Sequence, residues 1–199
     1  MKITSGWAKN LPLHTPKGLT TRPTRSRVRE AVLSSLQMEL PDAQIIDCFA
    51  GSGAMGLEMM SRGARKCTFL DSSQEAIACL RANRDALAAR AKASQLTPPK
   101  IEIRNWDLFQ NLAEWIDFFN NCDILWVDPP YDRALEWLTF YLGKKSICIK
   151  ENGILVIEMR SSDCVEAIRI LETQQVFSLK KIKTYGETTV IYADRSSGE

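Results

Sequence analysis

The chain has 199 residues, of which 45% are hydrophobic and 25% charged, as in a folded globular protein with one large domain. No stretch approaches the roughly 18 consecutive apolar residues that a membrane-spanning helix requires. The N-terminal MKITSGWAKNLPLH also lacks the apolar block of a signal peptide. We therefore expect a cytosolic protein, a monomer, with no membrane partner.

Metal and histidine chemistry are disfavoured by the residue counts. The six cysteines form no C-x-x-C pair and His14 is the only histidine, so the ligand spacings of a zinc site are missing. The single histidine also argues against acid–base or triad chemistry based on histidine, unless His14 itself is the base. Four cysteines fall within apolar, strand-like runs, where a free thiol behaves as a small hydrophobic side chain in a reducing compartment.

The net charge of +2 is unevenly distributed. Residues 1–30 hold seven basic residues and one acid, a net charge of +6, so the other 169 residues carry −4. A basic segment on a mildly acidic body indicates either a polyanionic partner or a solvated terminal arm, and charge alone leaves both open.

The N-terminal region is predicted to form an arm followed by a helix. Residues 1–21 contain two prolines, two glycines and short alternating runs, which indicate a small hairpin or an extended arm. A helix is predicted to open at Arg22-Pro23-Thr24, with Thr24 as its N-cap. Its apolar stripe consists of Val28, Val32 and Leu36.

From residue 44 the pattern alternates between strands and helices. Strands are predicted over 44–49, 67–71, 101–104, 123–127 and 153–159, with a final hairpin around 185–186. Helices are predicted from the glycine-rich turn to about 62, and over 73–90, 108–119, 133–142 and 163–172. This alternation predicts an α/β fold with an open, doubly wound, mostly parallel sheet. We expect a single domain over 1–199, with 1–40 as a basic arm plus helix and 41–199 as the catalytic sheet.

Ligands of such sheets bind beyond the carboxyl ends of the strands, where the strand order reverses. The two most unusual stretches, AGSGAMG and DPPY, follow the first and fourth predicted strands. Gly51 and Asp128 are 77 residues apart in sequence. We nevertheless expect the two motifs to face each other across one crevice.

The stretch DCFAGSGAMG contains a complete G-x-G-x-x-G directly after a strand and at the start of a helix. Glycines permit a tight turn and close approach of a ligand, and the helix N-terminus offers N–H groups. Asp71 ends the next strand, where a carboxylate can accept hydrogen bonds from the two ribose hydroxyls of an adenosine. The loop alone fits a nicotinamide dinucleotide as well as S-adenosyl-L-methionine.

Two acids favour S-adenosyl-L-methionine. Asp47, four residues before Gly51, would repel a pyrophosphate but suits the cationic methionine end. Asp107 follows the third strand, where its carboxylate can accept from the adenine amino group, cap a helix, or do both.

The sequence ILWVDPPYDR predicts a strand that ends on a rigid corner. An exocyclic amine on a nucleobase is a poor nucleophile because its lone pair is delocalised into the ring. Two acceptors on its N–H bonds, Asp128 and a proline carbonyl, would pyramidalise the nitrogen and stabilise the developing positive charge. Prolines keep such a carbonyl aimed, and Tyr131 can stack on the base. Pro-Pro alone is also a common strand-ending turn.

The chain resembles the bacterial small-subunit (16S) ribosomal RNA guanine-N2 methyltransferase family, the RsmD-like proteins. The resemblance runs nearly end to end, and its most specific part is RPTRSRVREAVLSSL ahead of DCFAGSGAMGLE. KITSGW, VDPPYDR, ENGILVIE and YGETTVIY are also similar to the family. The resemblance implies a Rossmann-like class I methyltransferase with a seven-stranded, mostly parallel sheet, a C-terminal antiparallel hairpin and a small N-terminal arm.

The resemblance also implies roles for individual residues. The predicted cofactor-binding residues are Asp47, Phe49, Gly51, Gly53, Asp71 and Asp107. The predicted catalytic residues, which receive the target guanine, are Asp128, Pro129, Pro130 and Tyr131. The predicted RNA contacts, made with 16S rRNA in the small subunit or its assembly intermediate, are Lys9, Arg22, Arg25, Arg27 and Arg29.

The leading hypothesis is S-adenosyl-L-methionine-dependent methylation of the N2 amino group of a guanine in 16S rRNA, with the base flipped from its stack. An adenine-N6 methyltransferase on DNA or RNA is the alternative enzyme, because DPPY suits any planar amine. A non-catalytic RNA-binding assembly factor is the alternative outside catalysis. A nicotinamide oxidoreductase ranks last, because neither Asp47 nor DPPY serves hydride transfer.

Overall fold

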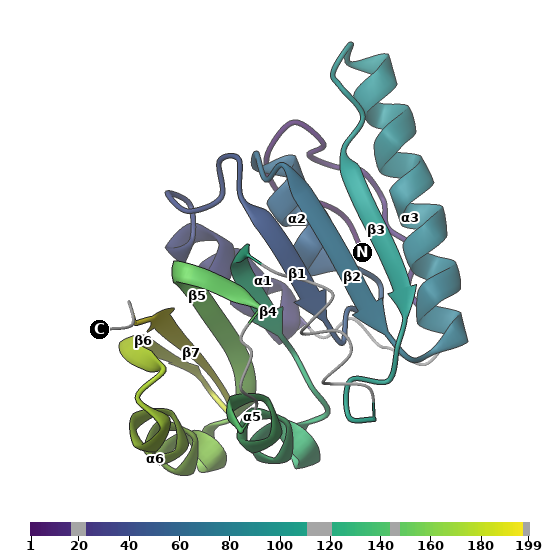
Figure 1. Ribbon diagram of the computed structural model, residues 1–199. Helices are drawn as coiled ribbons and strands as arrows, with labels where there is room; N and C mark the ends of the chain where they lie inside the picture. Colours follow the sequence, from purple (N-terminus) through teal and green to yellow (C-terminus); the bar gives the residue numbers. More distant parts are fainter. Residues whose placement is uncertain (17–22, 111–120, 144–147, 197–199) are drawn as a thin grey trace. The chain divides into compact units, whose positions relative to one another are not determined.

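Residues 1–16, 23–110, 121–143 and 148–196 are described by the computed structural model shown in Figure 1. The chain divides into two units, Met1–Trp106 and Asp107–Glu199, each with its own internal packing. The boundary after Trp106 differs from the expected division between the arm plus helix (1–40) and the sheet (41–199). The single-domain organisation over 1–199 stays a prediction.

The N-terminal arm of the first unit is a small hairpin, as predicted. Lys2 and Pro12 form an antiparallel bridge, and the Ile3 N–H donates to the Leu11 carbonyl at 3.0 Å. Helix α1 (Pro23–Ser35) follows. It starts at the proline, whose missing N–H costs nothing in a first turn. Thr24 therefore lies inside the helix, and its prediction as the N-cap is wrong.

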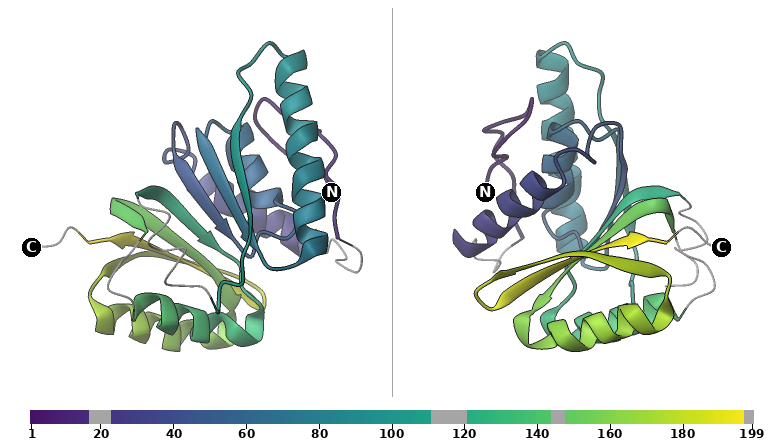
Figure 2. Two further views of the ribbon diagram at one scale, coloured as in Figure 1. Left: turned by 45° about the vertical axis from the view of Figure 1, so that its right-hand side comes forward. Right: turned by 90° about the vertical axis from the view of Figure 1, so that its left-hand side faces the viewer.

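The sheet of the first unit consists of three parallel strands in the order β3-β2-β1. The strands are β1 (Gln44–Cys48), β2 (Lys66–Asp71) and β3 (Lys100–Asn105). Helix α2 (Ala54–Ser61) connects the first two and helix α3 (Gln74–Ala93) the next two. Figure 2 shows the long α3 lying along β3. β1 and β2 are nearly continuous apolar runs, which is why they are buried in a parallel sheet.

Where the structure describes the second unit, it shows four strands in the order β4-β5-β7-β6. The strands are β4 (Cys122–Val127), β5 (Ile149–Arg160), β6 (Phe177–Tyr185) and β7 (Thr188–Arg195). β4 and β5 are parallel, whereas β7 runs antiparallel to both β5 and β6. The helices in the described part of this unit are η1 (Tyr131–Arg133), α5 (Ala134–Leu142), η2 (Ser161–Asp163) and α6 (Cys164–Gln174). α5 and α6 lie side by side in Figure 2.

The predicted α/β fold class is confirmed: seven strands, mostly parallel and with an antiparallel C-terminal hairpin, lie in the described residues. Four cysteines in the apolar runs are buried as expected: Cys48, Cys67, Cys122 and Cys148. Most of the helix predicted over 108–119 lies outside the described residues. The expected crevice between AGSGAMG and DPPY joins the two units and stays a prediction. Among the helices described, none is long and apolar enough to cross a membrane.

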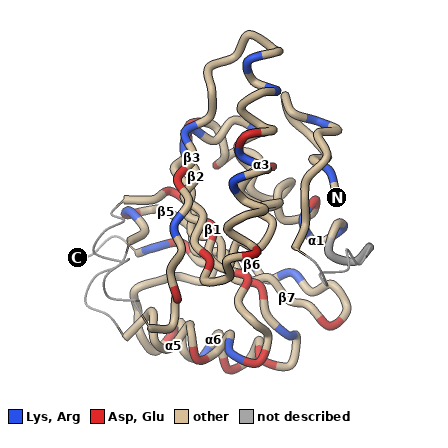
Figure 3. The backbone as a smooth tube through the Cα atoms, turned by 90° about the vertical axis from the view of Figure 1, so that its right-hand side faces the viewer, with Lys and Arg blue, Asp and Glu red and all other residues tan. Residues whose placement is uncertain are grey.

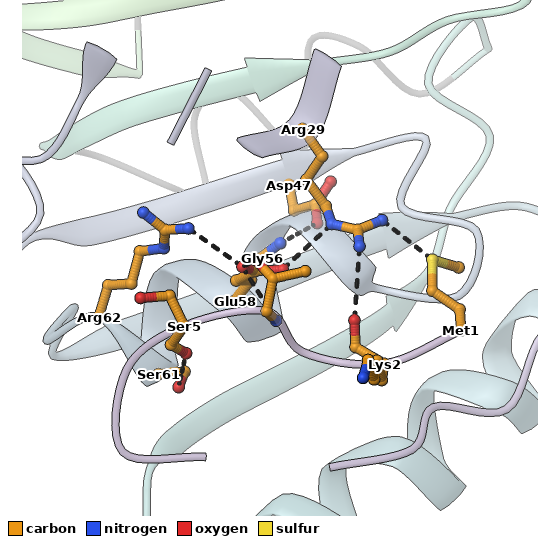
Figure 4. A network of polar contacts seen from close by, with 10 residues as sticks. Met1, Lys2, Ser5, Arg29, Asp47, Gly56, Glu58, Ser61 and Arg62 are labelled. Carbon is orange, nitrogen blue, oxygen red and sulfur yellow. Dashed lines mark hydrogen bonds and ion pairs between the residues drawn. The ribbon is translucent and has the colours of Figure 1, made fainter. Parts of the chain in front are cut away.

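A buried ion-pair network fastens the arm and α1 to α2 (Figure 4). Glu58 of α2 is fully buried. The Nε of Arg29 donates to its Oε2 at 3.1 Å, and the Nη2 of Arg62 donates to its Oε1 at 3.1 Å. Thr4 of the arm donates to the same carboxylate from its N–H and its hydroxyl, and Arg29 also reaches the Lys2 carbonyl oxygen. One carboxylate thus connects three segments of the first unit.

Replacing this carboxylate tests the network. Glu58→Ala leaves the Arg29 guanidinium buried without its anion, and we expect the free energy of unfolding to fall by about 3–5 kcal/mol, measured by urea denaturation. Asp85→Ala is the control, because it breaks the exposed Arg84–Asp85 pair and leaves stability unchanged. Equal losses in the two variants would contradict the assigned role of Glu58.

Candidate functional site

The loop after β1 has an unusual backbone. Phe49, Gly51 and Gly53 all have positive φ angles, of 59°, 56° and 75°. Such angles are ordinary for glycine, but an aromatic residue adopts them rarely and at an energetic cost. A Cβ added to Gly51 would meet nothing within 4 Å, so this side of the loop faces open space. The backbone here is shaped for something other than packing.

Gly53 and Gly56 have a different role from Gly51, because their surroundings are full. A Cβ on Gly53 would lie 2.5 Å from the Leu80 side chain. A Cβ on Gly56 would lie 2.5 Å from the Phe69 ring and 2.6 Å from the Cys67 Sγ. These two glycines let α2 pack directly against the sheet, which aims the helix N-terminus at the loop.

Two carboxylates fix the loop by accepting backbone N–H groups. Asp71 at the end of β2 accepts from Gly51 N–H at 2.8 Å through Oδ2, and from Ser73 N–H at 2.8 Å through Oδ1. The buried Asp47 accepts from Gly56 N–H in the first turn of α2 at 2.9 Å. A carboxylate has about four lone-pair sites, so Asp71, which is half-buried, can accept further donors.

Asn83 of α3 connects this loop to the N-terminal arm. Its side chain is fully buried. The Oδ1 accepts from His14 N–H at 2.7 Å, while the Nδ2 donates to the His14 carbonyl at 2.9 Å and to the Ser52 carbonyl at 2.8 Å. Arm, helix and glycine loop are therefore joined by one amide. Sequence analysis missed Asn83, because an asparagine inside a helix pattern has no distinguishing signal.

Asp107 begins the second unit and shapes a turn. Its Oδ1 accepts from the N–H groups of Phe109 at 2.9 Å and Gln110 at 3.3 Å. This is the capping geometry that the sequence allowed, and the adenine contact stays a prediction. The Phe109 ring is covered by the Arg133 guanidinium at 3.4 Å.

The DPPY corner ends β4 as predicted. Asp128 is half-buried and follows the buried Val127 directly. The Pro130 carbonyl accepts from Arg133 N–H at 2.8 Å, which closes the η1 turn. The supply of a second acceptor beside Asp128 by a proline carbonyl stays a prediction.

Tyr131 is held by its hydroxyl. The hydroxyl donates to Glu158 Oε1 of β5 at 3.1 Å and lies 2.9 Å from Thr188 Oγ1 of β7. Both partners are buried, each with 8% exposed surface, so the tyrosine is attached at its far end to two strands. Sequence analysis assigned neither Glu158 nor Thr188 a role, although ENGILVIE and YGETTVIY pointed to their segments.

The electrostatic surroundings of Tyr131 keep its phenol neutral. Desolvation raises the pKa of Tyr131 above its ordinary value of 10.0, and the nearby carboxylates of Glu158 and Asp128 raise it further, whereas the Thr188 hydrogen bond lowers it. The ring therefore stays an uncharged, oriented surface over the whole physiological pH range.

The five predicted RNA contacts differ in their surroundings. Lys9 and Arg27 are exposed, which suits the prediction. Arg29 is buried in the pair with Glu58, which favours a structural role for it instead. Arg22 lies outside the described residues, and the Arg25 side chain is not among those described.

Basic residues gather on the arm and on the neighbouring helix α3 (Figure 3). The Arg90 Nη2 donates to the backbone carbonyl of Lys9 at 3.4 Å, which brings the Arg90 guanidinium to the arm at Lys9. Both side chains are exposed. Like charges gathered at one surface favour an anionic partner there.

Comparison with known proteins gives a match over nearly the whole chain. The family described as "Conserved hypothetical protein 95" matches residues 1–194. Ribosomal RNA small subunit methyltransferase D of Escherichia coli (strain K12) is 30% identical over 158 residues, covering 79% of this chain and 74% of that protein. The protein of the same name from Haemophilus influenzae is 28% identical over 178 residues, covering 89% and 84%.

Solved structures agree on the fold. The yhhF protein of Escherichia coli superposes with a TM-score of 0.71 at 25% identity, covering 100% of this chain and 99% of that one. A ribosomal protein L11 methylase from Lactobacillus delbrueckii subsp. bulgaricus has a TM-score of 0.66 at 14% identity, covering 92% and 84%. At that identity the second likeness concerns the fold alone.

The state of Tyr131 can be measured by titration. We expect its phenol to ionise above pH 10, seen as the ultraviolet difference between wild type and Tyr131→Phe. Because the folded protein holds this proton more tightly than the unfolded chain, the stabilisation is present below about pH 10 and is lost as the pH rises. Glu158→Gln should lower the pKa towards 10. Ionisation of Tyr131 at or below its ordinary pKa would contradict the geometry described.

Proposed function

Because the chain belongs to the family described as conserved hypothetical protein 95, we propose that it is an S-adenosyl-L-methionine-dependent rRNA methyltransferase acting on the exocyclic N2 amino group of a guanine in 16S rRNA. The observation that carries the proposal is the anchored DPPY corner, in which Tyr131 is held by Glu158 and Thr188. The names of the relatives support ribosomal RNA of the small subunit as the substrate class.

The glycine loop fits S-adenosyl-L-methionine better than a dinucleotide. A dinucleotide places its pyrophosphate against the N–H groups at the helix N-terminus. Here Asp47 occupies the Gly56 N–H and brings negative charge to that end of α2. A pyrophosphate would be repelled, whereas the ammonium of a methionine moiety would be attracted. The structure of yhhF, at 25% identity, and the methyltransferase names of the relatives support the same choice.

In this proposal the loop and its carboxylates hold the cofactor. Gly51 and Gly53 line the methionine side, with Phe49 beside them, while Asp71 accepts from the ribose hydroxyls. Asp107 accepts from the adenine amino group. The bound cofactor supplies an electrophilic methyl group on a sulfonium.

The DPPY corner prepares the acceptor nitrogen. The lone pair of a guanine N2 is delocalised into the ring until the nitrogen becomes pyramidal. Asp128 accepts one N–H of the amine and the Pro129 carbonyl accepts the other, which directs the lone pair outward and stabilises the charge that develops on nitrogen. Tyr131 stacks on the base, worth about 1–3 kcal/mol. Because the corner is rigid before the base arrives, little reorganisation is needed.

The arm and α3 provide the contact with RNA in this proposal. Lys9, Arg27 and Arg90 are exposed cations in the first unit, and phosphate contacts of this kind give binding that weakens with salt. Arg22 and Arg25 are kept as proposed contacts on sequence grounds. Arg29 is not, because its guanidinium is committed to Glu58.

An adenine-N6 methyltransferase is the alternative activity, since the DPPY corner accepts any planar amine. The assay that separates the two supplies S-adenosyl-L-methionine with a labelled methyl group to undermethylated small subunits, then digests the RNA to nucleosides. We expect label in N2-methylguanosine. Label confined to N6-methyladenosine would refute the guanine assignment. Cofactor binding without any transfer would favour a non-catalytic assembly factor.

Asp128→Ala separates binding from chemistry. We expect the variant to bind S-adenosyl-L-methionine with unchanged affinity by calorimetry while methyl transfer falls by about 100- to 1,000-fold, the usual cost of losing one transition-state acceptor. Asp132→Ala is the matched control, because Asp132 is an exposed acid four residues along the chain and outside the clamp. Near-normal turnover of Asp128→Ala would rule out the amine clamp.

A further inference from the structure

Glu158 stands beside the first residue of the DPPY motif. The parallel strands β4 and β5 are in register with Val127 opposite Ile157. Asp128 is the residue directly after the end of β4, and Glu158 is the residue after Ile157 within β5. Matched positions of neighbouring parallel strands present their side chains on the same face. The negative charges of both carboxylates raise the pKa of the Tyr131 hydroxyl, so both lie near that group.

Glu158 is a buried acid, and burial of a carboxylate is costly unless its hydrogen bonds compensate. Its Oε1 accepts from the Tyr131 hydroxyl, which also contacts Thr188. β7 places Thr188 opposite Arg160, two residues beyond Glu158, and Thr188 contacts the Tyr131 hydroxyl that donates to this carboxylate. A carboxylate can accept about four hydrogen bonds. Accepting from the Tyr131 hydroxyl does not exclude a hydrogen bond from a base to the same carboxylate.

An acceptor beside the amine clamp could distinguish guanine from adenine, because the ring atom next to the amino group differs between the two bases. On the Watson–Crick edge of guanine, the N2 amino group is adjacent to a second donor, the imino N1–H. On adenine, the N6 amino group is adjacent to N1, which is an acceptor. A second carboxylate next to the amine clamp would thus bind guanine and repel adenine.

We propose that Glu158 is the specificity-determining residue of the DPPY site, accepting the imino N1–H of the guanine whose amino group is held at Asp128. This assignment rests on the proposed function and deepens it, because the clamp alone does not distinguish the bases. Glu158 then does two things with one carboxylate: it fixes the Tyr131 ring and it reads the edge of the base lying on that ring.

A cycle of one residue change and one base change tests the assignment. Once the acceptor nucleotide has been mapped, small subunits are reconstituted with RNA carrying 2-aminopurine there. This base keeps the 2-amino group but has a lone pair in place of the N1–H. Glu158→Gln keeps an oxygen for the Tyr131 hydroxyl and offers an N–H in place of a lone pair. The measured quantity is the ratio of kcat/KM for guanine to kcat/KM for 2-aminopurine.

We expect wild type to prefer guanine by about 10- to 100-fold, the discrimination typical of a specific base-edge contact. Glu158→Gln should lose that preference or reverse it. The loss of the guanine O6 in 2-aminopurine affects both enzymes and cancels in the cycle. If Glu158→Gln slowed transfer to both bases equally, with the ratio unchanged, the assignment would be overturned.

Two further variants separate reading the base from holding the tyrosine. Tyr131→Phe and Thr188→Val remove hydroxyl contacts but keep the carboxylate, so we expect slower transfer at an unchanged base ratio. If either shifted the ratio as far as Glu158→Gln, Glu158 would act only through the tyrosine. Should Glu158→Gln fail to fold, Glu158→Asp retracts the carboxylate and should show the same loss of preference. Wild type that methylates neither RNA would refute the proposed function itself.

Discussion

The hydrogen bond from Tyr131 to Glu158 is the interaction on which the proposed base site depends. It attaches a short loop after β4 to the neighbouring strand β5, and Thr188 extends the attachment to β7. Without it, Tyr131 would keep the contact between its hydroxyl and Thr188 but would lose its carboxylate partner on β5. With it, Tyr131 is held before any substrate arrives, which is a condition for electrostatic preorganisation of the proposed clamp.

The glycine loop of the first unit is likewise held by a few side-chain hydrogen bonds. Asp47 and Asp71 each accept a backbone N–H, and Asn83 holds the Ser52 carbonyl, so the loop is fixed by side chains from β1, β2 and α3. Both acids also bring negative charge to the loop. The positive φ of Phe49 adds local backbone strain at this place, which is common where a site is shaped for a ligand.

Much of this was predictable from sequence, for identifiable reasons. Strand and helix periodicity predicted the α/β order, and the family resemblance, confirmed by the match over residues 1–194, predicted the antiparallel C-terminal hairpin. The glycine pattern predicted the loop between Asp47 and Asp71, and DPPY predicted the corner that ends β4 at Asp128. What sequence could not predict were pairings between distant segments. Arg29 reads as a surface cation until its partner Glu58, 29 residues away, is seen. The roles of Asn83, Glu158 and Thr188 likewise become visible only from the backbone groups and side chains that the fold brings to them.

The central claim, methylation of a guanine amino group held at Asp128, is tested most directly in cells. Small-subunit RNA is isolated from cells lacking this chain and its nucleosides are quantified by mass spectrometry. The account predicts that one N2-methylguanosine per subunit is missing, that the wild-type chain restores it, and that Asp128→Ala does not. An unchanged N2-methylguanosine content, or full restoration by Asp128→Ala, would contradict it.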